Sequence, residues 1–164
     1  ERRAVNIHDV LDRARRSAEL GFARTMRFAE SFDPSLPPVW ADPDQLTQVF
    51  LNLFRNAAEA AGPSGGTIRI HSFYDPTLRL RRGDASHALP VQVEVSDDGP
   101  GIPPAILDEI FDPFVSGREN GTGLGLALVS RIIGDLGGWI GVDSRPGLTS
   151  FRIALEMVLK EGTL

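Results

Sequence analysis

Two glycine clusters, at residues 97–101 and 121–126, contain the residue types in this chain that could do chemistry. The first begins with two acidic residues, Asp97 and Asp98, directly after the strand-like run 91–95. The second runs into an apolar helical pattern. A glycine turn at a helix N-terminus presents free backbone N–H groups and a positive dipole end to a phosphate. An acid at one end of a loop and an anion cradle at the other therefore predict a nucleotide site.

The spacing of the clusters excludes two commoner nucleotide signatures. Neither cluster ends in the Lys-Ser or Lys-Thr pair that a P-loop requires. The dinucleotide fingerprint requires a third glycine where Leu126 stands. Because the chain contains 17 glycines, either cluster alone could be an ordinary turn. A third element is needed to decide between a site and two turns.

A long helix predicted over residues 42–61 supplies that third element. Asp42 is an N-cap acid followed by proline, and a Gly-Pro pair at 62–63 ends the pattern. Asn52 and Asn56 are four residues apart, so their amides share one face of the helix. Asparagine is a poor helix-interior residue, which suggests a role for the pair other than helix stability. A solvated face would explain a lone pair of this kind equally well.

The composition indicates a soluble globular domain. The chain has 164 residues, 41% hydrophobic content and a net charge of −5, which argues against a general nucleic-acid or membrane-surface binder. There are no cysteines, so disulfides, thiolate metal sites and cysteine nucleophiles are excluded. No apolar run approaches the length of a membrane span, and the N-terminus lacks the form of a signal peptide. We expect a cytoplasmic protein and, because the chain does not begin with Met, a fragment of a longer one.

Periodicity predicts the elements that must position these groups. Besides the helix at 42–61, helices are expected at 6–20, 103–110 and 123–136, and extended segments at 26–32, 39–40, 67–73, 91–96, 139–143 and 150–158. Residues 75–89, which carry Arg79, Arg81 and Arg82, are predicted to form a solvated polar connection. His8 is predicted to be an exposed residue in the first helical turn. Hairpin-joined strands against three helices indicate an α+β two-layer sandwich with a mixed, mostly antiparallel sheet.

With Asn56 included, the chain resembles the Bergerat-fold ATPase superfamily, which includes sensor histidine kinases, DNA gyrase B, the Hsp90 chaperones and MutL. Four motifs occur in the family's order: an N box at 48–57, a first glycine motif at 97–102, an F box at 110–114 and a second glycine motif at 121–126. The resemblance covers roughly residues 26–158. It implies one catalytic ATP-binding domain over 1–164, with an N-terminal helix at 1–25 and an ATP lid at 111–122.

The resemblance also implies roles for single residues. Asn56 would ligate the Mg²⁺ that bridges the ATP phosphates, Asp97 would accept a hydrogen bond from the adenine amino group, and Thr149 would help to hold adenine through a water. Glu59 stands where many histidine kinases have Lys, so positive charge is expected from Arg118. The remaining expected ATP contacts are Asn52, Arg55, Gly99, Gly101, Ile102, Phe114, Gly121, Thr122, Gly123, Leu124, Gly125 and Leu126.

One position separates the branches of the superfamily. Hydrolytic members carry a glutamate four residues before the metal asparagine, where it activates water, and this chain has Asn52 there. The chain is therefore most similar to sensor histidine kinases, in particular the nitrogen-regulation kinases of the NtrB type. This resemblance implies an ATP-dependent protein-histidine kinase of a two-component system. The chain has no phosphoacceptor histidine box, so the dimerisation domain that carries the target histidine would be absent.

The resemblance implies three protein partners. They are the kinase's own dimerisation domain, a response regulator and a candidate regulatory protein. No contact of this domain with nucleic acid or membrane is expected. Three alternatives stay open: an ATP hydrolase of the gyrase or MutL kind, a serine kinase of the anti-sigma-factor type, and a non-enzymatic docking module with a vestigial nucleotide site.

Overall fold

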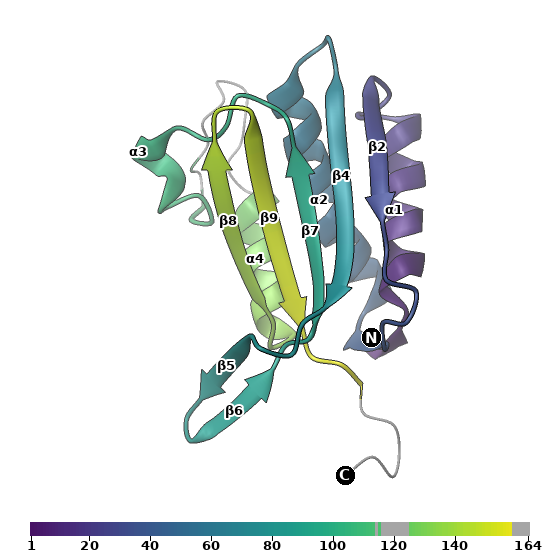
Figure 1. The fold of residues 1–164 in the computed structure, drawn as a ribbon, viewed down its shortest axis with the longest axis vertical. Helices are drawn as coiled ribbons and strands as arrows, with labels where there is room; N and C mark the ends of the chain where they lie inside the picture. The colour runs from purple at the N-terminus through teal and green to yellow at the C-terminus, as the bar shows by residue number, and fades with distance from the viewer. Residues whose placement is uncertain (114, 116–124, 159–164) are drawn as a thin grey trace.

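The computed structural model describes residues 1–113, 115 and 125–158. Its centre is a five-stranded sheet in the order β2-β4-β7-β9-β8, in which β2 is parallel to β4 and the other neighbours are antiparallel. These strands are β2 (Met26–Ser31), β4 (Gly66–Tyr74), β7 (Val91–Asp97), β8 (Trp139–Arg145) and β9 (Leu148–Leu155). Three helices, α1 (Ile7–Leu20), α2 (Pro43–Ala61) and α4 (Gly125–Asp135), cover one face, and the short α3 (Pro104–Leu107) lies beyond β8 (Figure 1). The predicted α+β two-layer sandwich is confirmed.

The core lies between the sheet and the helices. Alternate residues of the central strands point toward the helices and are almost completely buried, as the strand period of two requires. α2 is the central helix and packs against both α1 and α4. The apolar stripes of the three helices meet these strand residues; the fully buried members include Leu11, Phe50, Leu53, Ile68, Ile70, Ile133, Phe151 and Ile153.

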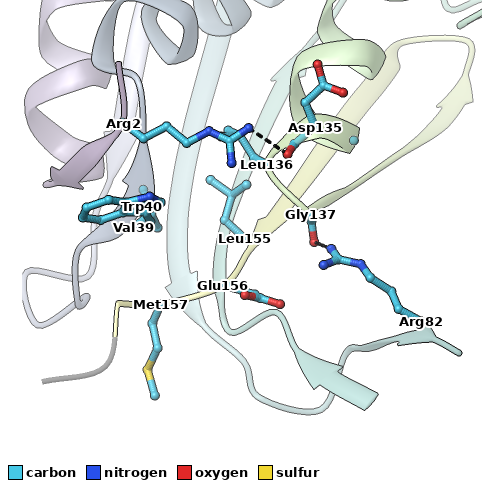
Figure 2. A pocket seen from close by; sticks show the side chains of 11 residues that line it. Arg2, Val39, Trp40, Arg82, Asp135, Leu136, Gly137, Leu155, Glu156 and Met157 are labelled. Carbon is cyan, nitrogen blue, oxygen red and sulfur yellow. Dashed lines mark hydrogen bonds between the residues drawn. The ribbon is translucent and has the colours of Figure 1, made fainter. Parts of the chain in front are cut away.

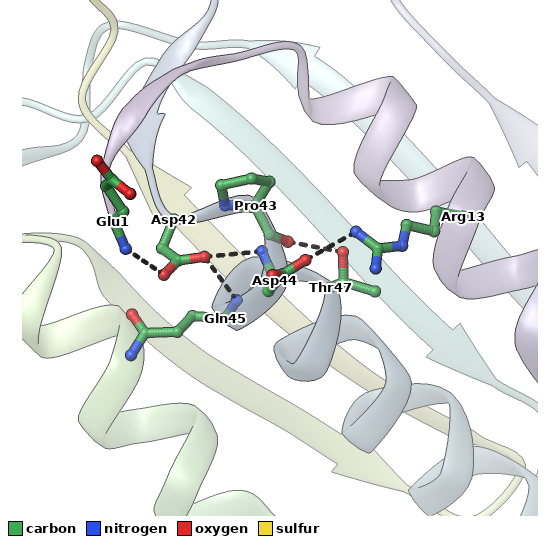
Figure 3. A network of polar contacts seen from close by, with 7 residues as sticks. All are labelled: Glu1, Arg13, Asp42, Pro43, Asp44, Gln45 and Thr47. Atoms are coloured by element: carbon green, nitrogen blue, oxygen red, sulfur yellow. Dashed lines mark hydrogen bonds and ion pairs between the residues drawn. The ribbon is translucent and has the colours of Figure 1, made fainter.

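The start of α2 follows from its capping residues (Figure 3). The side chain of Asp42 accepts the backbone N–H groups of Asp44 at 2.9 Å and Gln45 at 3.4 Å. Arg13 of α1 donates to the Asp44 carboxylate at 2.9 Å, which ties the two helices together. Gly62, at φ 76°, ends the helix. The predicted bounds of this helix are confirmed.

Residues 75–89 contain a β-hairpin rather than the predicted loop. Its strands are β5 (Arg79–Arg82) and β6 (Ala85–Ala88), which project from one end of the sheet (Figure 1). The turn contains Gly83 at φ 59°. At the base of the hairpin, the buried side chain of Gln92 donates to the Asp75 carbonyl at 3.2 Å and to the Leu89 carbonyl at 3.3 Å. These bonds fix where the hairpin leaves the sheet.

A second short pairing lies beside the main sheet. β1 (Arg3–Val5) runs antiparallel to β3 (Val39–Ala41), and Val39 also forms an isolated bridge with Met157. Both ends of the described chain are therefore held at one strand of three residues. Among the described residues, no helix is both long enough and apolar enough to cross a bilayer.

His8 is half-buried, so the prediction that it is exposed is wrong. Its ring stacks on Phe32 with 4.7 Å between centroids, and its Nε2 lies 2.8 Å from the Ser72 Oγ. Burial lowers the pKa of His8, against the opposing effect of the carboxylates of Asp33, Asp9 and Glu30. The helical period gives the direction of a side chain, but it cannot show that the β2–β3 loop folds over this one.

A cavity of about 480 Å³ lies at the C-terminal end of α4, between β3, the end of β9 and the hairpin (Figure 2). Arg2 donates to the Asp135 carbonyl at 3.0 Å, and Arg82 of β5 donates to the Gly137 carbonyl. The indole of Trp40, 56% exposed, forms part of the wall. Arg2 therefore caps the last turn of α4, which contains no basic residue of its own, and Arg82 binds the turn that follows it.

Candidate functional site

Asp97 and Thr149 lie side by side at the end of the sheet away from the hairpin. Asp97 is the last residue of β7 and is only 4% exposed, and its Oδ1 accepts the Gly99 N–H at 2.9 Å. Thr149 of β9, 3% exposed, pairs directly with Asp97 in the β7–β9 register. Paired residues in neighbouring strands point to the same face of the sheet, so a carboxylate and a hydroxyl share one buried location.

The glycines of the first cluster are needed because the loop after β7 is packed closely on two sides. A Cβ at Gly99 would lie 3.3 Å from the Cβ of Ala60 near the end of α2. Gly101 has φ +91°, and a Cβ there would lie 2.7 Å from the Arg145 carbonyl oxygen. The Gly147 N–H also donates to the Gly99 carbonyl at 3.0 Å. The loop is thus held between α2 and the β8–β9 turn.

Asn52 connects α2 to the first residue of α4. Its Oδ1 accepts from Gln48 Nε2 at 3.0 Å, and its Nδ2 lies 3.3 Å from the Gly125 carbonyl oxygen, to which it donates. Asn56 lies one turn further along α2, and Ala60, which faces Gly99, one turn beyond that. One stripe of α2 therefore runs from the start of α4 to the loop after Asp97.

Two of the remaining predicted residues also belong to this region. The Ile102 N–H closes the far side of the glycine loop, where it donates to the Ser144 Oγ at 2.7 Å. Leu126, in the first turn of α4, is 8% exposed and belongs to the hydrophobic core. Leu126 therefore anchors the start of α4 instead of exposing its side chain.

Arg55 is not part of this group. Its guanidinium lies over the ring of Phe22, 4.7 Å from the centroid, on the side of α2 that faces the end of α1. Asn52, by contrast, donates to the first residue of α4. Phe114, Arg118 and four members of the second cluster lie outside the described residues: Gly121, Thr122, Gly123 and Leu124.

Ser144 of β8 is a site residue that sequence reasoning missed. Its Oγ accepts the Ile102 N–H at 2.7 Å and lies 2.8 Å from the Thr149 Oγ1. The sequence signal for it is indirect, because the prediction of an antiparallel pair of final strands does not fix the register. The structure places Ser144 directly opposite Thr149 in that pair.

The donor and acceptor types at the two ends of this stripe of α2 fit a nucleotide. A carboxylate and a hydroxyl suit a base that carries an amino group. At the other end, amide oxygens are ligands that Mg²⁺ accepts, and the beginning of α4, a helix of 11 residues, provides the positive end of a dipole. The residues present therefore suit a ligand with a polar base at one end and phosphates with a magnesium ion at the other.

Comparison with known families and proteins agrees with this geometry. The family model described as "Histidine kinase-, DNA gyrase B-, and HSP90-like ATPase" matches residues 41–159. The "Sensory histidine kinase/phosphatase NtrB" of Rhodobacter capsulatus is 64% identical over 162 residues, which are 98% of this chain and 45% of that protein. The NtrB of Azospirillum brasilense is 52% identical over 96% of this chain and 40% of the relative. The chain thus spans less than half the length of these relatives.

Solved structures share the fold. The nucleotide-free catalytic domain of histidine kinase ThkA superposes with a TM-score of 0.77 at 30% identity, over 96% of each chain. Full-length ShkA, solved in complex with AMPPNP, gives a TM-score of 0.77 at 26% identity, over all of this chain and 33% of that one. Since the family match extends over well more than half of its residues, the chain belongs to the histidine kinase-, DNA gyrase B- and HSP90-like ATPase family.

Proposed function

We propose that this chain is the ATP-binding catalytic domain of an NtrB-type sensor histidine kinase. It binds Mg-ATP and donates the γ-phosphoryl group to a histidine on the dimerisation domain of a longer protein. The observation that carries the proposal is the polar stripe of α2, which connects Asn52 at the start of α4 with the loop after Asp97 through Asn56 and Ala60. The similarity to NtrB proteins supports the kinase branch.

At the base end, Asp97 accepts a hydrogen bond from the adenine amino group. The carboxylate is buried and already accepts the Gly99 N–H, so an additional donor from a ligand is favourable there. Thr149 is adjacent in the same row of the sheet and contacts the base directly or through water. The glycines at 99 and 101 allow the backbone to pass close to the base.

At the phosphate end, Asn56 supplies an amide oxygen to Mg²⁺. When bound, the ion would neutralise charge on the phosphates. The start of α4 faces the same phosphates with its backbone N–H groups, and Arg118 adds a side-chain cation. Phosphoryl transfer depends mainly on positioning and charge neutralisation, so these groups orient the phosphates toward the acceptor.

The amide at position 52 favours transfer of the phosphoryl group to a protein over hydrolysis of ATP by water. Both ends of its amide are already engaged, one by Gln48 and one by the Gly125 carbonyl. An amide cannot accept a proton at neutral pH, so this position provides no general base for water. The phosphoryl acceptor would be the histidine of the dimerisation domain, and a response regulator would receive the phosphoryl group next. The kinase and the response regulator would both be cytoplasmic.

Replacement of Asn56 tests the proposal. Asn56→Ala should reduce Mg²⁺-dependent phosphoryl transfer from labelled ATP to a supplied histidine-bearing dimerisation domain to background, because the metal ligand is lost. Gln45→Ala, an exposed change in the first turn of the same helix, is the matched control and should transfer at the wild-type rate. Undiminished transfer by the Asn56 variant would refute the metal assignment. Absence of ATP binding by the unaltered chain would refute the proposed function itself.

A further inference from the structure

Asn52 lies between two polar groups whose chemistry fixes the orientation of its amide. The Gly125 carbonyl oxygen, 3.3 Å away, can only accept a hydrogen bond, so the group that faces it is the Nδ2 donor. The Oδ1 then faces Gln48, one turn earlier in α2, and accepts from the Gln48 Nε2 at 3.0 Å. The amide therefore has a single orientation, in which it connects α2 to the first residue of α4.

The bond to Gly125 lies at the phosphate end of the proposed nucleotide site. Ala60, which faces Gly99 at the base end, is eight residues further along α2, roughly 12 Å along the helix axis. The helix that begins at Gly125 carries the backbone N–H groups that the proposed function directs at the phosphates. A change at Asn52 should therefore disturb the phosphate contacts and leave the base contacts intact.

Apolar packing alone does not define where α4 begins relative to α2. The side chain of Leu126 is 8% exposed and keeps the start of α4 in the hydrophobic core. Apolar contacts are non-directional, so they restrict the depth of a helix more than its position along a neighbour. A hydrogen bond has a narrow range of distances and angles, so the bond from Asn52 fixes the place of the Gly125 carbonyl.

We propose that Asn52 is a positioning residue that, oriented by Gln48, holds the start of α4 where it can bind the same phosphates as the magnesium ion on Asn56. The inference rests on the proposed function. It assigns Asn52 an indirect effect on ATP, through the Gly125 carbonyl, in place of the direct contact that the family resemblance implies. Gln48 contributes less than Asn52, because its side chain is exposed and a Gln–Asn pair four residues apart interacts weakly.

NMR titration of the chain with ATP and with adenosine tests the inference. Asn52→Ala should weaken ATP binding about tenfold and adenosine binding less than about twofold, because the base end is unchanged. The loss of ATP affinity should be the same in Mg²⁺ and in EDTA, since the N–H groups of α4 bind phosphate without the metal. Asn56→Ala, on the same stripe of α2, is the matched control, and its loss should appear only in Mg²⁺.

Hydrogen exchange of the nucleotide-free chain separates positioning from direct contact. The N–H of Val129 reaches back to the Gly125 carbonyl in the first turn of α4. Without the bond from Asn52 this turn should open more often, so Asn52→Ala should speed exchange at Val129 about fivefold. A residue that only touched the nucleotide would leave this rate unchanged.

Gln48→Ala provides a second variant at an exposed position, where failure to fold is not expected. It should weaken ATP binding about twofold, leave adenosine binding unchanged, and cause no further loss in the Asn52→Ala background, because both residues act through one bond. Equal losses for ATP and adenosine, a loss that requires Mg²⁺, or unchanged exchange at Val129 would overturn the inference while the proposed function stands. Failure of the unaltered chain to bind ATP would overturn both.

Discussion

The bond between Asn52 and Gly125 makes a quantitative prediction about the helix pair α2 and α4. Asn52→Asp keeps the size of the side chain but turns the amide donor, 3.3 Å from the Gly125 carbonyl oxygen, into a second oxygen. The loss of one neutral hydrogen bond and the approach of a carboxylate to a carbonyl should together cost about 1–2 kcal/mol in the free energy of unfolding at pH 7. For a domain of this length the expected decrease in Tm is roughly 3–6 °C.

The pH dependence of this effect identifies its cause. A carboxylate facing a carbonyl has a raised pKa in the folded state, whereas its unfolded value is about 3.9. The penalty should therefore be complete above the folded pKa and should close as the pH falls through it, because the protonated carboxyl can donate to the Gly125 carbonyl as the amide does.

Urea unfolding of variant and wild type at pH 7 and pH 4 measures this difference. Gln45→Glu makes the same amide-to-carboxyl change at an exposed position of α2 and should alter stability by less than about 0.5 kcal/mol at either pH. A stability difference that is absent, or equal at both pH values, would refute the structural role of the Asn52 amide.

Two further predictions concern the glycine loop and the half-buried His8. Gly101→Ala should lower the free energy of unfolding by about 2–3 kcal/mol, because backbone strain at positive φ adds to an overlap of the new Cβ with the Arg145 carbonyl. Gly147 is also at positive φ, but a Cβ there would lie in open space. Gly147→Ala should therefore cost only about 1 kcal/mol in the same urea titration. Equal costs would show that the close approach does not matter. The pKa of His8 is lowered by burial, so the folded state binds its proton less tightly than the unfolded state, and stability should decrease as the pH falls below about 6.5. His8→Asn should flatten that slope between pH 5.5 and 7.5, and an unchanged slope would assign it to other groups.

The fold could be predicted largely from local signals. The Asp42 cap, the following proline and Gly62 define α2 in the sequence, and the structure confirms them. The extended segments predicted at 67–73, 91–96 and 150–158 likewise correspond to β4, β7 and β9. These features succeed because capping, turn chemistry and burial act over a few residues, so their traces lie together in the chain.

The missed features depend on distant partners. The hairpin at 75–89 has no apolar alternation, and it is held at its base by Gln92, which lies outside it in β7. The burial of His8 requires a loop more than twenty residues away. At the candidate site, the motifs predicted roles for Asn52 and Asp97, but the connection of Thr149 to Ser144 depends on strand register, and the position of Arg55 depends on Phe22. Spacing alone determines neither.

The bond from Arg82 to the Gly137 carbonyl connects the exposed β5–β6 hairpin to the segment directly after α4. Replacing the hairpin with a tight turn, for example to obtain a more compact protein for crystallisation, would remove a cation from beside the negative end of the α4 dipole. The helix affected is the one whose opposite end begins at Gly125, beside Asn52. We therefore expect a chain without the hairpin to bind nucleotide differently, although every residue of the candidate site would be kept.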